Sequence, residues 1–191
     1  MSKTSHNSRI SIIPDLFEEL HIAAVYATNN AAIGIIPCPG RNHIDKSGNL
    51  WRRDLTKDLE VIEAWGATAI LSLIESCEFD CLGVPNFPDV VSERTISWYH
   101  LPIPDMSSPK QAFLNAWEDS GEEILRGLEH GQRIILHCAG GLGRSGMLAA
   151  KLLVALGTSP SEAIEQVRHA RPGAIETADQ ESYIHHGCSL V

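Results

Sequence analysis

The sequence predicts an α/β fold in which a central, mostly parallel sheet is flanked by helices. Three observations support this prediction: short apolar runs alternate with segments of helical periodicity, glycine or proline separates them, and one apolar run passes through a glycine-rich turn into an apolar helix. That run covers residues 134–137, and the turn covers residues 139–143. Strand, turn and helix in this order place the turn at the carboxyl end of a strand, where layered α/β sheets usually bind ligands.

Four strands are expected, and each is a short apolar run of the kind that is buried inside a sheet. They cover residues 34–36, 69–73, 96–101 and 134–137. The first of them ends at the turn Pro37-Cys38-Pro39-Gly40.

Two helical segments are expected in the first half of the chain. Asp54 is a candidate N-cap for a helix at residues 55–65, in which apolar residues recur at helical spacing and which Gly66 ends. The stretch after Glu75 is expected to form a short helix or a loop that closes at Gly83.

Four more helices are expected in the second half. A long helix covers residues 109–130, another begins near Arg144, a third starts at Ser159-Pro160 and runs to residue 170, and a short one covers residues 180–186. The residues of the long helix that are expected to face inward are Phe113, Leu114, Trp117, Ile124, Leu125 and Leu128.

Length and composition are those of one globular domain. A single domain spanning residues 1–191 is expected, with a polar, loose N-terminal arm at residues 1–9 that lacks the apolar core of a signal peptide. The net charge of −9 argues against a general nucleic-acid or anionic-membrane surface. No run of about 18 apolar residues is present to cross a membrane. We therefore expect a cytoplasmic protein without nucleic-acid or membrane partners.

The five cysteines are an odd number and have no disulfide-framework spacing, which fits a reducing compartment. Cys77 and Cys81 could share one face of a helix, but two ligands do not make a zinc site, and buried thiols are the preferred interpretation. No metal and no cofactor is expected.

The glycine-rich turn has the composition of an anion-binding loop with a nucleophile. Cys138 and Arg144 stand six positions apart in His137-Cys138-Ala139-Gly140-Gly141-Leu142-Gly143-Arg144-Ser145-Gly146. The three glycines between them permit a turn whose N–H groups point inward, and the following helix aims its positive end at the same place. That environment favours a thiolate at Cys138, and Arg144 offers a planar fork to two phosphate oxygens. Ser145 is placed to donate a hydrogen bond to the thiolate.

The alternative is that this segment is an ordinary nucleotide-binding strand–turn–helix. The turn lacks the Lys-Ser/Thr ending of a P-loop, and it lacks the G-x-G-x-x-G order of a dinucleotide-binding turn. The combination of a cysteine at its start and an arginine at its end therefore favours a phosphate pocket.

With these residues the chain resembles the cysteine-dependent protein phosphatases, whose hallmark is H-C-x5-R followed by Ser or Thr. More narrowly, it is similar to the kinase-associated, cyclin-dependent-kinase-inhibitor type of dual-specificity phosphatase. The resemblance covers most of the chain, about residues 34–185. The further segments that fall in the family's order are Ile33-Gly34-Ile35 with Pro39-Gly40, residues 53–58, Pro102-Ile103-Pro104-Asp105, and Gly173-Ala174-Ile175 with Thr177, Gln180 and Tyr183.

The resemblance implies a three-layer protein-tyrosine-phosphatase-like fold and a two-step hydrolysis of phosphomonoesters. In it Cys138 attacks phosphorus and forms a phosphocysteine, an aspartic acid protonates the leaving oxygen, and water then releases phosphate. The phosphate would be bound by Arg144 and by the loop residues Ala139, Gly140, Gly141, Leu142 and Gly143.

Asp105 is the candidate general acid. It lies on a proline-rich loop after an expected strand, and the related family places its acid on the corresponding loop. The alternative is that Asp105 is only a turn residue. Asp80 and Asp89 are weaker candidates.

Glu176-Thr177-Ala178-Asp179-Gln180 is the candidate for positioning the hydrolytic water. In related tyrosine phosphatases a Q-T-x-x-Q segment has this role, and here Glu176 replaces the first glutamine. Gln180 could still serve, whereas a Glu176 carboxylate would repel a dianion and is expected to face an arginine such as Arg41 or Arg171. The alternative is a capping box formed by Thr177 and Gln180 at a helix start.

The substrate class follows from the neutral loop. Residues 139–143 carry no basic side chain, which favours a single phosphomonoester: phosphotyrosine on a protein, with phosphoserine or phosphothreonine as a further option. The expected partner is a phosphorylated protein, a kinase among the candidates. Arg41 and His43 either line the rim of the pocket or belong to a solvated loop.

Three rival functions remain. One is a phosphatase acting on a non-protein phosphomonoester, and another is a binding module for phosphorylated ligands with little turnover. A sulfurtransferase or arsenate reductase also uses a cysteine loop, but there the acid Asp105 would be superfluous.

Overall fold

The computed structural model describes residues 19–27, 30–45, 48 and 50–190. The arm expected at residues 1–9 lies outside the described residues.

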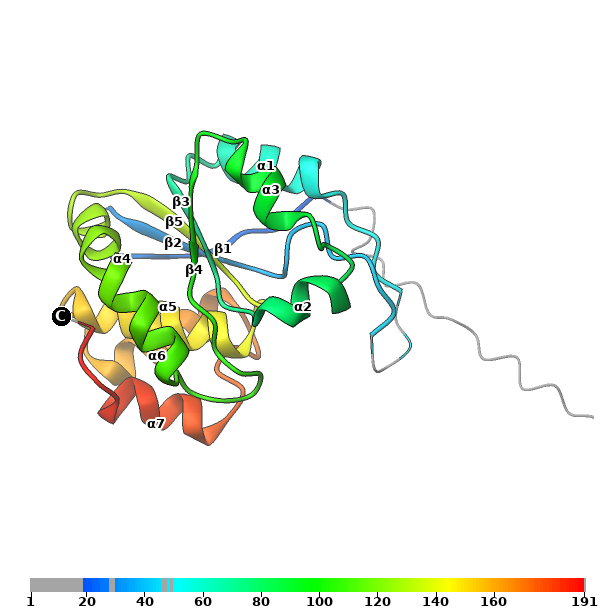
Figure 1. Ribbon diagram of the computed structural model, residues 1–191. Coiled ribbons are helices and arrows are strands. Elements are labelled where there is room, and N and C mark those ends of the chain that lie inside the picture. The colour runs from blue at the N-terminus through cyan, green and yellow to red at the C-terminus, as the bar shows by residue number, and fades with distance from the viewer. Residues whose placement is uncertain (1–18, 28–29, 46–47, 49, 191) are drawn as a thin grey trace, which may run out of the picture.

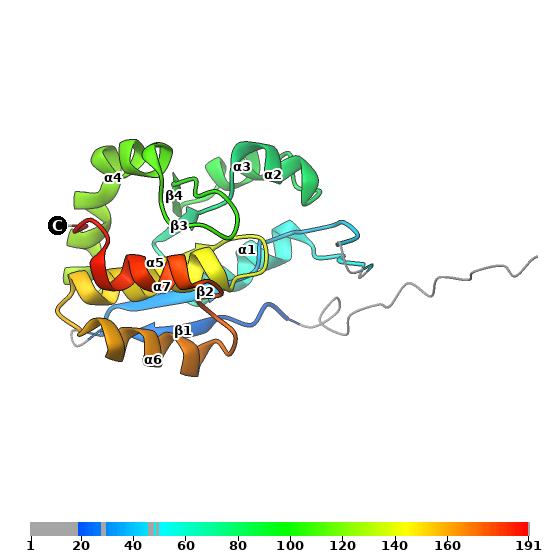
Figure 2. The ribbon, with the colours of Figure 1, turned by 90° about the horizontal axis from the view of Figure 1, so that it is seen from below.

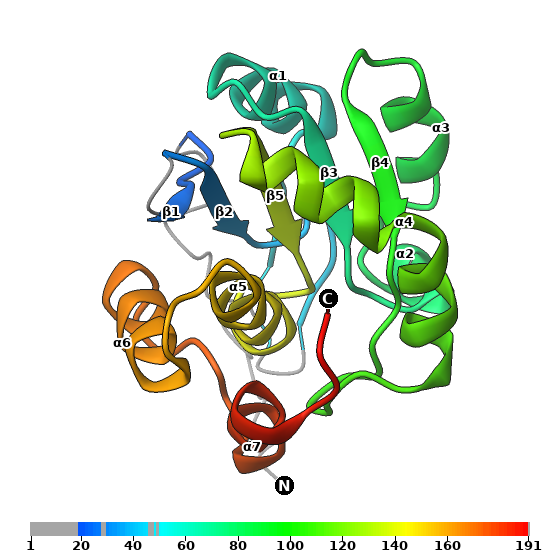
Figure 3. The same cartoon turned by 90° about the vertical axis from the view of Figure 1, so that its left-hand side faces the viewer.

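A five-stranded sheet forms the centre of the molecule (Figure 3). Its strands are β1 (Ala23–Tyr26), β2 (Ala32–Ile36), β3 (Ala69–Ser72), β4 (Ser97–His100) and β5 (Arg133–His137), in the order β1-β2-β5-β3-β4. Strand β1 pairs antiparallel with β2, and all other neighbours are parallel. The expected α/β fold with a mostly parallel sheet is therefore confirmed.

The four expected strands are present within two residues of their expected bounds, and β1 is an addition. Strand β5 is central because it pairs with β2 on one side and with β3 on the other. Its residues Ile134, Ile135, Leu136 and His137 are all buried. Burial on both faces explains why β5 has a continuous apolar run instead of an alternating pattern.

Helices cover both faces of the sheet. They are α1 (Leu55–Ala64), α2 (Ser76–Cys81), α3 (Phe87–Ser92), α4 (Gln111–Glu129), α5 (Gly143–Ala155), α6 (Pro160–Ala170) and α7 (Ala178–His186). Helices α1 and α3 lie on one side and α5 and α6 on the other, with α7 outside α5 (Figures 1 and 2). Helix α4 packs against β5.

Three helix starts form as their sequences predict. Asp54 accepts a hydrogen bond from the Lys57 N–H at 3.1 Å, and Ser159 accepts one from the Glu162 N–H at 3.4 Å. Thr177 caps α7 in a capping box with Gln180, as the alternative interpretation of that segment predicted. These caps satisfy N–H groups that have no partner inside the helix.

Two expectations are corrected. Helix α3 was not predicted, because six residues are too few for helical periodicity to be visible. Cys77 and Cys81 are exposed instead of buried, because α2 is a short helix that buries only Phe79.

In the long helix α4, Phe113 and three other expected residues are buried, whereas Leu114 and Trp117 are partly buried. Within the described ranges, no helix is long and apolar enough to cross a membrane.

A buried ion pair fixes the turn after β2. The Arg53 Nη2 and Asp58 Oδ1 atoms lie 2.6 Å apart, with side chains 7% and 4% exposed, and Arg53 Nε also donates to Asp58 Oδ2 at 2.8 Å. The same Oδ2 accepts from the Gly40 N–H at 2.8 Å. Helix α1 thereby holds the turn that carries Cys38 and Arg41.

We predict that Asp58→Ala lowers the free energy of unfolding by about 3–5 kcal/mol, because it removes one partner of a buried ion pair and the acceptor of the Gly40 N–H. Urea unfolding of the purified variant measures this loss. Glu60→Ala is the matched control, because Glu60 is an exposed acid on the same helix and should change stability by about 0.5 kcal/mol or less. Equal losses in the two variants would contradict the assigned role of the ion pair.

Candidate active site

His137, the last residue of β5, has its ring held by two hydrogen bonds. Its Nε2 lies 2.6 Å from Ser72 Oγ, which also accepts from Trp98 Nε1 at 2.8 Å, and its Nδ1 lies 3.4 Å from the Cys138 carbonyl oxygen. That carbonyl can only accept, so the network assigns the proton to Nδ1 and makes Nε2 the acceptor for the Ser72 hydroxyl. Burial lowers the pKa of His137 to about 3, which keeps the ring neutral. The start of the loop is therefore tied to β3.

The carbonyl groups of the next three loop residues are turned outward. Arg41 Nη1 donates to the Ala139 oxygen at 2.8 Å, while Arg171 donates to the Gly140 and Gly141 oxygens, each at 3.2 Å. In a planar trans peptide the C=O and the following N–H point in opposite directions. The amide N–H groups that follow these carbonyls therefore point to the inside of the loop, which is the expected anion-binding arrangement.

Two of the loop glycines are required by their surroundings. Gly141 has a φ of 67°, and a Cβ there would overlap the backbone of Ile36. A Cβ on Gly143 would lie 2.5 Å from Glu176 Oε2 and 2.8 Å from Gln180 Nε2. The absence of side chains lets the loop pack against β2 on one side and against the start of α7 on the other.

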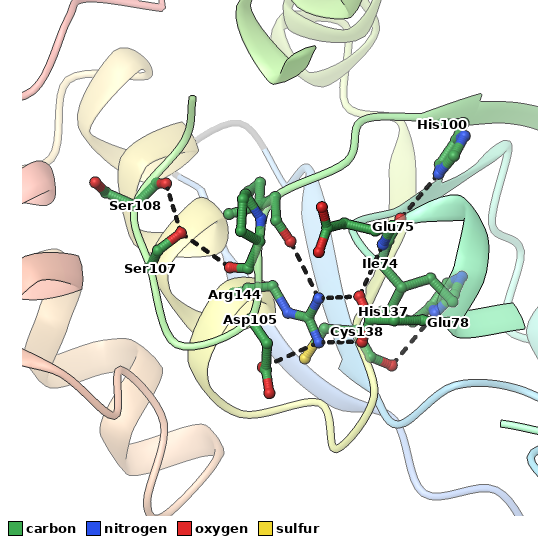
Figure 4. A network of polar contacts seen from close by, with 12 residues as sticks. Ile74, Glu75, Glu78, His100, Asp105, Ser107, Ser108, His137, Cys138 and Arg144 are labelled. Atoms are coloured by element: carbon green, nitrogen blue, oxygen red, sulfur yellow. Dashed lines mark hydrogen bonds and ion pairs between the residues drawn. The ribbon is translucent and has the colours of Figure 1, made fainter. Parts of the chain in front are cut away.

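Arg144, in the first turn of α5, is 2% exposed and is held by several oxygens (Figure 4). Its Nη1 and Nη2 donate to the two carboxylate oxygens of Glu78 at 2.6 and 2.9 Å, and Nη1 also donates to the Ile103 carbonyl at 3.1 Å. Asp105 Oδ1 lies 3.1 Å from Nη2. Burial alone would lower the pKa of Arg144, but the hydrogen bonds to Glu78 and the electrostatic effects of the neighbouring Cys138, Glu78 and Asp105 together raise it. Arg144 is therefore a fixed cation.

Of the three candidate acids, Asp105 is the one found among the described partners of Arg144. Its side chain is 61% exposed, on the loop after β4, whereas Asp80 and Asp89 are exposed on α2 and α3. Asp105 is thus close to the loop and open to solvent, as an acid that must exchange protons requires.

Cys138 differs from the other buried cysteine, Cys38. The Cys38 thiol is fully buried, and that burial raises its pKa, which makes it a poor nucleophile. Cys138 is 4% exposed, and Figure 4 shows its sulfur beside the guanidinium of Arg144. The buried hydroxyl of Ser145 has no hydrogen-bond partner in the described part of the chain, which leaves it free to donate.

The segment before α7 reaches the same loop. Gln180 Oε1 accepts from the Glu176 N–H at 2.9 Å and from the Thr177 N–H at 3.3 Å, and its Nε2 is buried with no partner among the described residues. Glu176 is exposed, with Oε2 toward Gly143. Arg41 and Arg171, the expected partners of Glu176, donate instead to the loop carbonyls.

The structure therefore brings together Cys138, Arg144, Ser145, Asp105, Gln180 and Glu176 around residues 139–143. Glu78 was missed by the sequence reasoning, because it stands 66 positions before Arg144 in the sequence and no local pattern connects the two. The only available signal was its position just after the carboxyl end of β3, at the edge of the sheet where ligands bind.

A mostly parallel sheet whose central strand ends in an H-C-x5-R-S loop defines the class of cysteine-dependent phosphatases, which are phosphoric monoester hydrolases. The chain belongs to the cyclin-dependent kinase inhibitor 3 family, whose model matches residues 20–165. It is 34% identical to cyclin-dependent kinase inhibitor 3 of Rattus norvegicus and 33% identical to that of Homo sapiens. Each match spans 156 residues, 80% of this chain and 70% of the relative.

Solved structures agree with this assignment. The kinase-associated phosphatase with its catalytic-site cysteine substituted by serine superimposes with a TM-score of 0.75 at 30% identity, covering 88% of this chain and 94% of the other. The active form of the phosphatase Tk-PTP gives a TM-score of 0.59 at 27% identity, covering 84% and 92%. The chain is therefore a protein phosphatase of the tyrosine and dual-specificity type.

We predict that His137 stays neutral from pH 8 down to pH 5. Its pKa is lowered to about 3, below the ordinary value of about 6.5, so protonation favours the unfolded chain. The neutral, buried ring therefore stabilises the folded state fully above the ordinary histidine pKa. This stabilisation is lost as the pH falls from that value towards the lowered pKa of His137. Histidine NMR titration measures this, with the exposed His130 as reference. A His137 resonance that titrates between pH 6 and 7 would contradict the prediction that burial keeps this ring neutral.

Proposed function

We propose that the chain hydrolyses phosphotyrosine on a protein substrate, with phosphoserine or phosphothreonine as further substrates, through a phosphocysteine on Cys138. The observation that carries the proposal is the set of three outward-turned loop carbonyls, because it directs the amides toward the space beside Cys138 and Arg144. Such a nest of N–H groups binds a phosphate dianion and stabilises a thiolate.

Arg144 has one edge available for the phosphate. Both hydrogens of Nη1 are used by Glu78 and Ile103, and one hydrogen of Nη2 is used by Glu78. The remaining fork consists of the Nε–H and the second Nη2–H, which fits two phosphate oxygens. Glu78 is then a positioning residue that holds the plane of this fork.

In the first step the Cys138 sulfur attacks phosphorus, the S–P bond forms and the bond from phosphorus to the leaving oxygen breaks. Asp105 gives its proton to that oxygen. Asp105 Oδ1 contacts the Nη2 that a phosphate oxygen would take, so a bound phosphate displaces the carboxyl group from Arg144 and frees it to reach the leaving oxygen.

In the second step water attacks phosphorus and the S–P bond breaks. Asp105, now a carboxylate, takes the proton from water, and the Ser145 hydroxyl donates a hydrogen bond to the departing thiolate. The buried Nε2 of Gln180, which has no hydrogen-bond partner among the described residues, supports a role in orienting this water. Exposed Glu176 lies beside the same loop residue, Gly143, and is the second candidate for that role.

The names of the relatives support a phosphorylated kinase as the substrate, because one is a kinase-associated phosphatase and others are inhibitors of cyclin-dependent kinases. The absence of basic side chains at residues 139–143 supports a single phosphate. A non-protein phosphomonoester is the competing substrate class, and a phospho-ligand binding module is the competing function.

We predict that Cys138→Ser abolishes turnover of para-nitrophenyl phosphate and of phosphopeptides, because a hydroxyl at this position is not ionised. Vanadate should still bind, since the amides and Arg144 remain. Cys77→Ser, an exposed cysteine on α2, is the matched control and should keep full activity. Turnover by the Cys138 variant would refute the assignment of Cys138 as the nucleophile.

A panel of phosphopeptides, nucleotides and inositol phosphates assayed with the unmodified protein decides the substrate class. A preference for the non-protein esters would overturn the proposal of a protein substrate.

We predict that Asp105→Asn slows hydrolysis of phenyl phosphate by about 10²–10⁴-fold, the usual contribution of a placed acid. Para-nitrophenyl phosphate should be slowed less, because nitrophenolate leaves more readily without a proton. Asp80→Asn and Asp89→Asn are matched controls, since both are exposed acids that sequence alone left as candidates. Unchanged rates in the Asp105 variant with both esters would move the acid to another residue.

A further inference from the structure

The loop that carries Asp105 is attached to the start of α7 by one charged side chain. Asp179 Oδ2 accepts a hydrogen bond from the Ser108 N–H at 2.7 Å, across 71 residues of sequence. Hydrogen bonds from the Ser108 side chain and backbone lower the pKa of Asp179, so the carboxylate stays ionised. Asp179 is exposed to solvent, so what the structure shows is a single charge-assisted hydrogen bond that links the loop of Asp105 to the start of α7.

Ser108 moves together with Asp105 because the residues between them form a compact turn. The Ser107 Oγ lies 3.0 Å from the carbonyl oxygens of both Pro104 and Ser108, so its one hydroxyl hydrogen is shared between them, and the Ser107 N–H donates to the Pro104 oxygen at 3.3 Å. Figure 4 shows the Ser107 side chain and the Asp105 side chain on this one turn. Displacing Ser108 therefore displaces the acid.

The other half of the loop is anchored independently. The Leu101 N–H donates to Ser72 O at 2.9 Å, and the Ile103 N–H donates to Leu73 O at 3.1 Å. The Ile103 carbonyl also accepts from Arg144. Asp105 thus lies between two fixed points of its loop: the hydrogen bonds to the end of β3 before it and the hydrogen bond to Asp179 after it.

Helix α7 is itself fixed to the helix that begins at the phosphate loop. Lys151 of α5 is 6% exposed, and its Nζ donates to the Gly187, Tyr183 and Ile184 carbonyls at 3.1, 3.4 and 3.5 Å. At the other end of α7, Gln180 lies against Gly143. The position of Asp179 relative to Cys138 is therefore set by α5 and α7 together.

We propose that Asp179 is a positioning residue for the general acid: it holds the loop of Asp105 at a set distance from the phosphate loop. This inference rests on the proposed role of Asp105. The competing explanation is that Asp179 only stabilises α7, because an acid in the first turn interacts favourably with the helix dipole. Glu181 separates the two explanations. It is the other acid in the same turn, and its described partner is Arg168, 2.7 Å away, instead of the acid loop.

The test is a leaving-group series of aryl phosphates with the full chain, in which kcat and KM are measured for Asp179→Ala and for the matched control Glu181→Ala. We expect Asp179→Ala to lower kcat/KM for phenyl phosphate, which reports the first step, by about tenfold or more, since small displacements of a catalytic group are costly. The loss should shrink for nitrophenyl esters, and inorganic phosphate should inhibit as before. Glu181→Ala should show no dependence on the leaving group.

Two further variants sharpen the result. Asp179→Asn should recover part of the rate, because its amide oxygen still accepts from the Ser108 N–H. In the Asp105→Asn background, Asp179→Ala should cost nothing more, because the acid is already absent. A loss in Asp179→Ala that is equal for all esters, or equal to that of Glu181→Ala, would overturn the positioning role. If the rate loss in Asp105→Asn does not depend on the leaving group, the assignment of Asp105 as the acid fails, and the positioning role of Asp179 fails with it. If the loss depends on the leaving group in Asp105→Asn but not in Asp179→Ala, only the positioning role fails.

Discussion

The orientation of the carbonyl groups at residues 139–141 is the constraint on which the site depends. A short glycine-rich loop can turn its peptides either way, and only one way directs the N–H groups toward the sulfur of Cys138. Two guanidinium groups, those of Arg41 and Arg171, stabilise this orientation from outside the loop. At the start of the loop, the buried His137 links the Cys138 carbonyl to Ser72 on β3. The conformation of residues 139–143 thus depends on side chains from their surroundings as well as on the glycines of the loop itself.

The same contacts resolve a problem of charge. The protein carries a net charge of −9, and Arg144 is flanked by the carboxylates of Glu78 and Asp105. A dianion would bind poorly to Arg144 and its two carboxylate neighbours alone. Arg41 and Arg171 place two more positive charges against the loop, and the amides add partial ones. The loop is therefore surrounded by positive charge, as the proposed phosphate site requires, although the molecule as a whole is acidic and the loop has no basic side chain.

Much of the fold was predictable, because the signals that define it are local. Asp54 and Thr177 cap helices through bonds to residues three positions away, and β5 shows its burial in its own apolar run. The elements that were missed lack such signals. Helix α3 is too short for a period to emerge, and β1 is four residues long at the edge of the sheet. The misjudged burial of Cys77 has the same origin, since exposure depends on which elements pack over α2.

The sequence by itself determined four of the five strands and all helices except α3, the H-C-x5-R-S loop at the end of the central strand, and the candidates Cys138, Arg144 and Asp105, because each depends on neighbouring residues or short spacings. Only the tertiary structure decided that Glu78 holds Arg144, that Asp105 and not Asp80 or Asp89 reaches the guanidinium, and that Asp179 contacts Ser108 on the loop of Asp105. These pairs are separated by tens of residues, and their meeting depends on how the parallel sheet brings the ends of different strands to one edge.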